Sequence, residues 1–217
     1  MKKNKTKFQE NFEAILIAII LALFIRSFIV EPFKIPSGSM IPTLLVGDHI
    51  LVNKFIYGIR IPFTNKKIFT FKKPAREDVI VFAYPLDPSL DFIKRVIGVE
   101  GDTILIKGKN LYINGKLYSD KHAYYLEDNL GGMELPRGDF GPITVPKNSL
   151  FVLGDNRDTS RDSRFWGFVP LDLVIGKAFI IYWSNGSTQN RSPWNYPMKF
   201  IDAIVYNRWS RIGNRIN

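Results

Sequence analysis

The sequence predicts a mostly β protein that follows one N-terminal membrane-spanning helix. Residues 14–30 form an apolar run with a single charged residue, Arg26, and no second run of this length occurs in the 217-residue chain. Beyond Pro32, short segments rich in Val, Ile and Phe alternate with turn residues, a pattern typical of β-strands. With 46% hydrophobic and 14% aromatic residues, the chain can bury a substantial core, so we expect a folded domain after the helix.

The apolar run predicts an uncleaved membrane anchor. Its 17 residues would span about 25 Å as a helix, and continuation to Phe33 approaches the thickness of a bilayer. Arg26 lies near one end of the run, where a long basic side chain can reach the headgroups. A cleaved signal peptide is the alternative, but the run is longer than most signal-peptide cores and no small-x-small cleavage site precedes Pro32.

Basic residues set the expected orientation and the expected partners. Four lysines lie within residues 1–7, and the positive-inside rule places such a segment in the cytoplasm. We therefore expect a cytoplasmic segment over residues 1–13, an anchor over residues 14–32 and one extracytoplasmic domain over residues 33–217. The net charge of +10 suits anionic membrane lipid, whereas no basic segment interleaved with aromatic residues favours nucleic acid, the competing partner.

Short strands account for most of the expected domain. They are predicted over residues 46–55, 78–82, 92–99, 103–106 and 149–153. Residues 111–117 contain an Asn-Gly pair, which supplies the two positive φ angles of a type I′ hairpin turn. Residues 173–183 predict a long buried strand, in which Gly176 indicates a bulge. Residues 121–141 are polar and glycine-rich, and predict a loop.

Cysteine chemistry is excluded, because the chain has no cysteine for a disulfide, a thiolate nucleophile or a zinc–thiolate site. The two histidines, His49 and His122, have no marked partner in the sequence. A Ser-His-Asp triad remains an alternative, although the chain has no Gly-x-Ser-x-Gly nucleophile motif. We expect no cofactor.

A hydroxyl nucleophile is indicated directly after the anchor. The segment Ile-Pro-Ser-Gly-Ser-Met at residues 35–40 holds two serines around a glycine, close to the expected membrane surface. By itself, such a segment is also ordinary turn chemistry. Hydrolysis of an amide needs a base that takes the proton of the nucleophile, so a second group is required.

Lys94 is the candidate base. Alternation along the expected strand places Phe92, Lys94 and Val96 on one face of the sheet, and Arg95 then points to the other. Burial among apolar neighbours disfavours the ammonium and can lower the usual lysine pKa, about 10.4, by several units. The alternative is an edge-strand lysine that prevents aggregation, and the strand pattern alone favours this alternative.

A polar run at residues 154–164, Gly-Asp-Asn-Arg-Asp-Thr-Ser-Arg-Asp-Ser-Arg, is the third motif. Its alternating oxygen atoms would also suit a calcium loop. However, it lacks the turn glycine and the terminal bidentate glutamate of an EF-hand, and its internal arginines would repel a cation. We therefore expect no metal ion.

In this order, the three motifs resemble bacterial type I signal peptidase, the membrane-anchored Ser/Lys protease that removes signal peptides. The resemblance extends from about Arg26 to Ile212. It implies that Ser39 is the nucleophile and that Lys94 is the general base. It also implies an oxyanion hole formed by the Ser37 hydroxyl and the Ser39 backbone N–H.

The same resemblance gives roles to the polar run. Ser160 matches the serine that hydrogen-bonds to the lysine and orients it. Asp162 and Arg164 match a structural ion pair behind the site. Asp155 and Arg157 would brace the same loop.

The fold that the resemblance implies is a β-barrel or sandwich core with an inserted β-ribbon region over about residues 101–148, which is short for a Gram-negative member. Residues 209–212, however, resemble the C-terminal tail of Gram-negative signal peptidases and favour a bacterial inner membrane as the location. Four aromatic residues of the C-terminal part suggest either a membrane-interface belt or packing under the sheet: Tyr182, Trp183, Trp194 and Trp209.

Apolar residues around the two candidate catalytic residues could line shallow pockets for small side chains at the −3 and −1 positions, as in the Ala-x-Ala pattern of signal peptides. These expected pocket residues are Phe33, Ile35, Pro36, Met40, Leu44, Phe92 and Ile93. Phe92 stands where better-known relatives have tyrosine, so one hydroxyl is lost from the pocket. The substrate, a preprotein emerging from the secretion translocase, would bind as an added strand beside residues 91–94.

Two other functions fit many of these features. A related Ser/Lys processing protease with one dedicated substrate would use the same catalytic residues. A membrane-tethered β-domain that only binds secreted peptides would not need them, and the complete set of matched serines and lysine argues against it. Self-cleaving repressor-type proteases share the Ser/Lys pair but lack a membrane anchor, and this chain carries no DNA-binding region.

Overall fold

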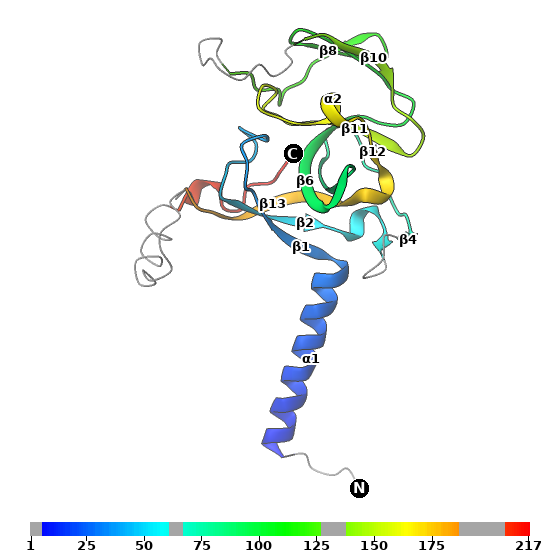
Figure 1. Cartoon of the computed structure of the whole chain (residues 1–217). Coiled ribbons are helices and arrows are strands. Elements are labelled where there is room, and N and C mark those ends of the chain that lie inside the picture. The colour runs from blue at the N-terminus through cyan, green and yellow to red at the C-terminus, as the bar shows by residue number, and fades with distance from the viewer. Residues whose placement is uncertain (1–5, 61–66, 127–137, 187–206) are drawn as a thin grey trace.

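The computed structural model describes residues 6–60, 67–126, 138–186 and 207–217. It contains antiparallel sheets and one long N-terminal helix that stands away from them (Figure 1). The predicted mostly β fold class with one N-terminal helix is therefore confirmed. Trp194 and residues 127–137 of the expected loop lie outside the described residues.

Helix α1 (Lys7–Phe28) contains the apolar run. A capping box starts it, in which the Gln9 amide donates to the Thr6 hydroxyl and the Thr6 amide donates to the Gln9 side chain. Its 22 residues would extend about 33 Å, so the helix is long and apolar enough to cross a membrane. No residue within α1 is buried by the rest of the chain.

The boundaries of α1 differ from those of the expected anchor over residues 14–32. The helix begins at Lys7 and ends at Phe28, and strand β1 (Val30–Lys34) follows almost at once. Pro32 lies in β1 opposite Leu51 of the neighbouring strand. Proline cannot continue a helix interior but is tolerated in an edge strand, so residues 30–32 belong to the sheet.

The larger sheet has seven antiparallel strands in the order β1-β2-β13-β5-β6-β11-β12. Besides β1, its strands are β2 (Asp48–Asn53), β5 (Val79–Tyr84), β6 (Asp87–Gly98), β11 (Ser149–Leu153), β12 (Val169–Pro170) and β13 (Val174–Ser184). The register of β13 against β5 shifts between Val174 and Gly176, which confirms the predicted bulge. Strand β6 begins five residues before the predicted start at residue 92.

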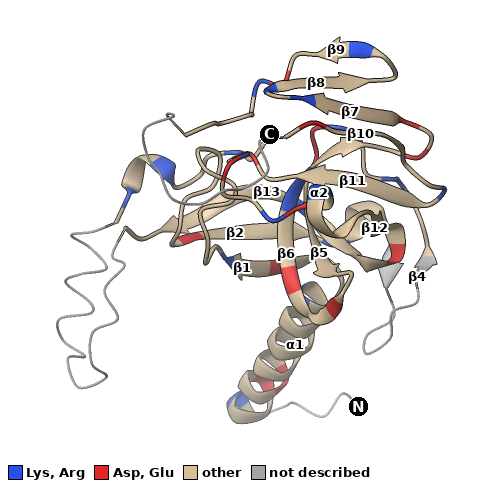
Figure 2. Ribbon diagram, turned by 45° about the horizontal axis from the view of Figure 1, so that its top comes forward, with Lys and Arg blue, Asp and Glu red and all other residues tan. Residues whose placement is uncertain are grey.

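A second sheet of four strands, in the order β10-β7-β8-β9, lies at the end of the molecule remote from α1 (Figure 2). Its strands are β7 (Thr103–Lys107), β8 (Asn110–Ile113), β9 (Lys116–Tyr118) and β10 (Phe140–Thr144). Asn114 and Gly115 have φ angles of 53° and 76°, which confirms the predicted hairpin turn. All four strands lie within the expected insertion over residues 101–148.

The remaining elements are short. They are η1 (Phe55–Tyr57), β3 (Ile59–Arg60), β4 (Lys67–Phe69), α2 (Ser163–Trp166), η2 (Leu171–Leu173) and η3 (Trp209–Arg211). Strands β3 and β4 pair with each other in a small separate ribbon.

The hydrophobic core anchors the segment that follows β1. Ile35, Met40 and Leu44 are buried in one cluster with residues of β2 and β13. A neighbouring cluster joins β6 and β11 to the second sheet through residues such as Ile104 and Phe151. Because apolar residues on both sides of Ser39 are held in the core, the turn that carries this serine has a defined position.

Candidate active site

Ser39 and Lys94 come together although 55 residues separate them in the sequence. The Lys94 Nζ lies 2.8 Å from the Ser39 Oγ. The serine is 8% exposed and the lysine 4%. Lys94 also donates to the carbonyl oxygen of Ile93 at 2.9 Å, so a neutral amine would keep its lone pair for the Ser39 hydroxyl proton.

Lys94 is buried, next to the point where the pairing of its strand with β11 begins. Its strand, β6, lies between β5 and β11, and Lys94 is opposite Ile80 of β5. A lysine that blocks edge-to-edge aggregation must project into solvent, whereas this side chain is buried. The edge-strand alternative is therefore wrong.

Burial changes the acidity of Lys94. It lowers the pKa of the Lys94 ammonium from its usual 10.5 to about 8, and the carboxylates of Asp162 and Asp155 offset part of that effect. The Phe92 ring, whose centroid lies 5.6 Å from Nζ, is within cation–π distance and also favours the ammonium. Near pH 8, a large fraction of Lys94 is thus the neutral amine that a base requires.

The Ser39 turn leaves two donors without an acceptor in the described chain. The Ile41 amide donates to the Gly38 carbonyl at 3.2 Å and the Leu44 amide to the Met40 carbonyl at 2.8 Å, which closes the turn. Ser37 is exposed, and neither its hydroxyl nor the Ser39 backbone N–H has an acceptor in the described part of the chain. Both groups can therefore donate to a substrate oxygen.

Ser160 is buried close to the Ser39 backbone without contacting Lys94 by a hydrogen bond. Its side chain is 1% exposed, and its Oγ has no hydrogen-bond partner among the residues that the structure describes. A Cβ on Gly154 would lie 2.2 Å from the Ser160 Oγ and 2.5 Å from the Ser39 carbonyl oxygen. Only glycine at position 154 therefore allows the polar run to approach Ser39 this closely.

Arg95 and Asp155 form an ion pair behind the site, and both side chains are 0% exposed. The Arg95 Nε and Nη2 donate to the two Asp155 carboxylate oxygens at 2.8 and 2.7 Å, and Thr43 donates to the same carboxylate at 2.5 Å. Arg95 also donates to the Glu77 carbonyl at 2.9 Å. Strand β6, the Ser39 turn and the polar run are therefore fixed to one another.

Sequence reasoning missed Arg95 and Thr43. Alternation along the strand predicted that Arg95 points to the face opposite Lys94, but it named no partner for the guanidinium. The available signal was an arginine between buried aliphatic residues of a central strand, since such a charge needs a buried carboxylate.

Two further ion pairs hold the polar run. The Arg164 Nε and Nη2 donate to the Asp162 carboxylate at 2.8 and 3.0 Å, and Asp162 accepts from the Gly154 amide at 3.0 Å. Arg157 pairs with Asp120 and donates to the Gly154 carbonyl at 3.0 Å. These carboxylates are occupied by guanidinium groups, and within the described ranges no cluster of His, Asp or Glu is suited to a metal ion.

The ring and ionic contacts that the structure gives for the two histidines are with residues other than Ser39. His49 contacts the Tyr182 ring, with 5.9 Å between the ring centroids. His122 lies 3.4 Å from the Glu77 carboxylate. In the part of the chain that the structure describes, the side-chain hydrogen-bond partner of Ser39 is Lys94. This arrangement favours a Ser-Lys pair over the Ser-His-Asp alternative.

The expected pocket residues divide into two groups. Ile35, Met40 and Leu44 are core residues with almost no accessible surface. The residues that retain accessible surface are Phe33, Pro36, Phe92 and Ile93. Direct contact with a substrate is therefore possible for the second group in this conformation.

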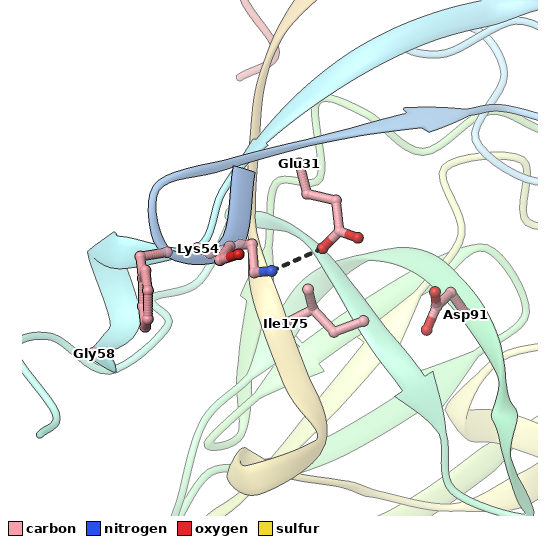
Figure 3. Close-up of a pocket in the computed structure, with 7 residues that line it drawn as sticks. Glu31, Lys54, Gly58, Asp91 and Ile175 are labelled. Carbon is pink, nitrogen blue, oxygen red and sulfur yellow. Dashed lines mark ion pairs between the residues drawn. The ribbon is translucent and has the colours of Figure 1, made fainter. Parts of the chain in front are cut away.

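A separate cavity of about 150 Å³ lies where α1 meets the sheet. Figure 3 shows Glu31, Lys54, Gly58, Asp91 and Ile175 around it, with the Lys54 Nζ 3.1 Å from the Glu31 carboxylate. Its lining includes neither member of the Ser39–Lys94 pair, so it is distinct from the candidate active site.

Residues 8–183 match the family described as signal peptidase, peptidase S26. The chain belongs to this family. It is 42% identical over 196 residues to signal peptidase I of Pseudomonas aeruginosa, covering 76% of this chain and 69% of the relative. It is 38% identical over 255 residues to the Aquifex aeolicus signal peptidase I, covering 91% of this chain and 95% of the relative.

Among solved structures, a signal peptidase I from Enterococcus faecalis is similar to this chain. That crystal structure shares 35% identity, covers 50% of this chain and 98% of its own, and has a TM-score of 0.41. Membership of the signal peptidase family makes the chain a serine endopeptidase.

Proposed function

We propose that Ser39 and Lys94 are the catalytic dyad with which this signal peptidase I cleaves the signal peptides of preproteins. The observation that carries the proposal is the 2.8 Å separation of Ser39 Oγ from a buried lysine amine. The lowered pKa of Lys94 supports it, because a protonated amine could not accept the serine proton.

The reaction follows from this geometry. Ser39 Oγ attacks the scissile carbonyl carbon while its proton moves to Lys94, and the carbonyl oxygen becomes an oxyanion that the Ser39 N–H and the Ser37 hydroxyl stabilise. The Lys94 ammonium then protonates the leaving amine, which breaks the peptide bond and leaves an acyl-enzyme. A water molecule, deprotonated by Lys94, hydrolyses the acyl-enzyme and restores Ser39.

Residues of the polar run support this pair in the proposal. The buried Ser160 hydroxyl has no partner in the described chain, and in the proposal it orients Lys94 by turning to the amine. Asp155 and Arg157 brace the run against its neighbours. The ion pair of Asp162 with Arg164 holds the amide of Gly154 and so keeps Ser160 close to Ser39.

The substrate would bind as an extended strand along β6. The pairing of β6 with β11 covers Arg95 to Gly98, so this ladder does not extend along Phe92 and Ile93. A peptide added there would run beside Phe92 and Ile93 toward Ser39. Their bulk favours small side chains at the −3 and −1 positions of the signal peptide.

We infer that the catalytic domain acts at the outer face of the inner membrane. The lysines before α1 favour a cytoplasmic N-terminus, so residues after the helix would be extracytoplasmic. The surrounding partners would be membrane lipid and the secretion translocase that delivers preproteins. The proposed order is a cytoplasmic segment, an anchor and an extracytoplasmic domain, with α1 over residues 7–28 as the anchor in place of the expected residues 14–32.

The dyad is tested with the full-length protein in detergent and a generic preprotein. Ser39→Ala and Lys94→Ala should each abolish cleavage while the fold is kept, because nucleophile and base act as a unit. His49→Ala and His122→Ala serve as matched controls and should remain active. Substantial cleavage by either dyad variant, or an inactive but folded histidine variant, would contradict the proposal.

A second experiment separates an enzyme from a domain that only binds peptides. A serine-directed acylating reagent should modify the wild type covalently and should not modify Ser39→Ala.

A further inference from the structure

One residue outside the proposed dyad holds the backbone on both sides of Ser39. The Asn156 amide N–H donates to the Ser39 carbonyl oxygen at 3.1 Å, and its Nδ2 donates to the Gly38 carbonyl oxygen at 3.4 Å. Asn156 is 4% exposed and directly follows Asp155, whose carboxylate is clamped by Arg95. The position of Asn156 is therefore fixed by the same ion pair that lies behind Lys94.

The contact with Gly38 controls a group that faces the substrate. The Gly38 carbonyl and the Ser39 N–H belong to one planar peptide group and point in opposite directions. Hydrogen bonds to the Gly38 oxygen from Asn156 and from the Ile41 amide therefore set the direction of the Ser39 N–H. This N–H has no acceptor of its own among the residues described, so it is both oriented and unoccupied.

The contacts of the Asn156 side-chain amide show which of its two polar atoms, Nδ2 or Oδ1, interacts with the Ser39 turn. The Oδ1 atom is buried and has no partner in the described chain. Rotating the amide by 180° would bring Oδ1 against the Gly38 oxygen, where two acceptors repel each other. A buried acceptor without a partner costs free energy, and an apolar side chain would avoid that cost. The observation therefore points to a role for the Nδ2 donor.

We propose that Asn156 is a positioning residue for the oxyanion hole, because it orients the Ser39 N–H toward the scissile carbonyl. This inference rests on the proposed dyad. When Ser39 Oγ bonds to the carbonyl carbon and its proton passes to Lys94, the carbonyl π electrons move to the oxygen. The resulting oxyanion accepts from the Ser39 N–H more strongly than the ground-state carbonyl does, so correct orientation stabilises the transition state more than the bound substrate.

Two substitutions in the full-length enzyme test the inference. Asn156→Ala removes the side-chain donor, and Asn156→Asp keeps the size but places a carboxylate against the Gly38 oxygen. Each should lower kcat about 10- to 100-fold with KM changed less than about threefold, and the Asp variant should lose at least as much as the Ala variant. In Asn156→Ala the rising limb of the pH–rate profile should not move, because this change alters no charge and Asn156 makes no hydrogen bond to Lys94.

A tetrahedral adduct gives a readout that a merely structural role would not change. A peptide aldehyde ending in alanine adds to Ser39 Oγ and forms an oxyanion without a leaving group. Its inhibition constant should rise in each Asn156 variant by the same factor by which kcat/KM falls. Asn114→Asp, in the hairpin turn of the second sheet, is the matched control: losing its donation to Asp102 should lower stability and leave the inhibition constant unchanged.

An unchanged inhibition constant in both Asn156 variants would overturn the inference, as would an equal loss in Asn114→Asp. Unfolding of both Asn156 variants would assign the residue a purely structural role and would overturn it as well. If wild type fails to cleave a preprotein, or Ser39→Ala still cleaves it, the dyad itself is wrong. The two failures are therefore distinguishable.

Discussion

Lys94 has a pKa near 8 because its ammonium is removed from water, and nearby charge acts in the opposite direction. The carboxylates of Asp162 and Asp155 both favour the ammonium. Each carboxylate is bound by a guanidinium, from Arg164 and Arg95 respectively, which weakens its field at Lys94. The basicity of the lysine therefore depends on these two ion pairs as well as on burial.

The pH dependence of the reaction follows from the neutral fraction of Lys94. Because the pKa is lowered to about 8, kcat/KM should rise with pH and the rising limb should be centred near pH 8. The measurement is a pH–rate profile on a signal-peptide substrate. A limb near pH 6.5 would indicate a histidine base, and one above pH 10 would indicate a solvated lysine.

Gly154 lies so close to Ser39 and Ser160 that a larger side chain would not fit. Gly154→Ala should lower kcat more than tenfold and destabilise the fold by about 1–3 kcal/mol, because the added Cβ would overlap the Ser39 carbonyl and the Ser160 hydroxyl. Gly138→Ala is the control, since a Cβ there meets open space. Cleavage rates and urea unfolding curves measure both effects, and equal behaviour of the two variants would refute the steric argument.

At the scale of elements, strand β6 and the polar run after β11 form the site only when they are joined. Their charged link is the Arg95–Asp155 pair, which bridges residues 60 positions apart. Thr43 adds the Ser39 turn to the same carboxylate. Lys94 directly precedes Arg95, and Asn156 directly follows Asp155. A substitution that breaks the ion pair should therefore shift the positions of both Lys94 and Asn156.

Removing one partner of this pair should therefore be costly. Arg95→Ala leaves the Asp155 carboxylate buried and without its guanidinium, and the free energy of unfolding should fall by about 3–5 kcal/mol. Lys73→Ala, which breaks the exposed pair with Glu100, should cost about 0–1 kcal/mol. Denaturant unfolding of both variants makes the comparison, and similar losses would show that burial of the Arg95 pair is not decisive.

At the scale of the whole molecule, α1 contributes no residue to the core of the β domain. None of the residues in this helix is buried by the chain, although many are large and apolar. Such a surface is stable in a lipid bilayer and unfavourable in water. The β domain has its own core, so α1 takes no part in forming the site and would serve to hold it at the proposed membrane.

The orientation predicts a protease-protection pattern. Protease added outside spheroplasts should digest the domain after β1, while an epitope fused before Lys7 should stay intact until the membrane is permeabilised. The opposite pattern, with a protected β domain, would reverse the topology. It would also contradict cleavage at the outer face.

Much of the fold could be predicted from the sequence because its signals are local. The apolar run indicated a helix, alternating apolar residues indicated most strands, and the Asn-Gly pair at positions 114–115 indicated a hairpin. The boundaries were less predictable. Pro32 was counted with the anchor, whereas pairing of β1 with β2 places it in the sheet, and such pairing depends on residues distant in the sequence.

The sequence by itself determined the membrane-length helix, the order of strands and, through its three motifs, the resemblance to signal peptidases. Only the tertiary structure decided that Lys94 is buried rather than at an exposed edge, that it meets Ser39, and that Arg95 meets Asp155. It also brought Asn156 to the carbonyl oxygens beside Ser39. The physical reason is that secondary structure follows from neighbours along the chain, whereas burial and charge pairing follow from how sheets and turns pack.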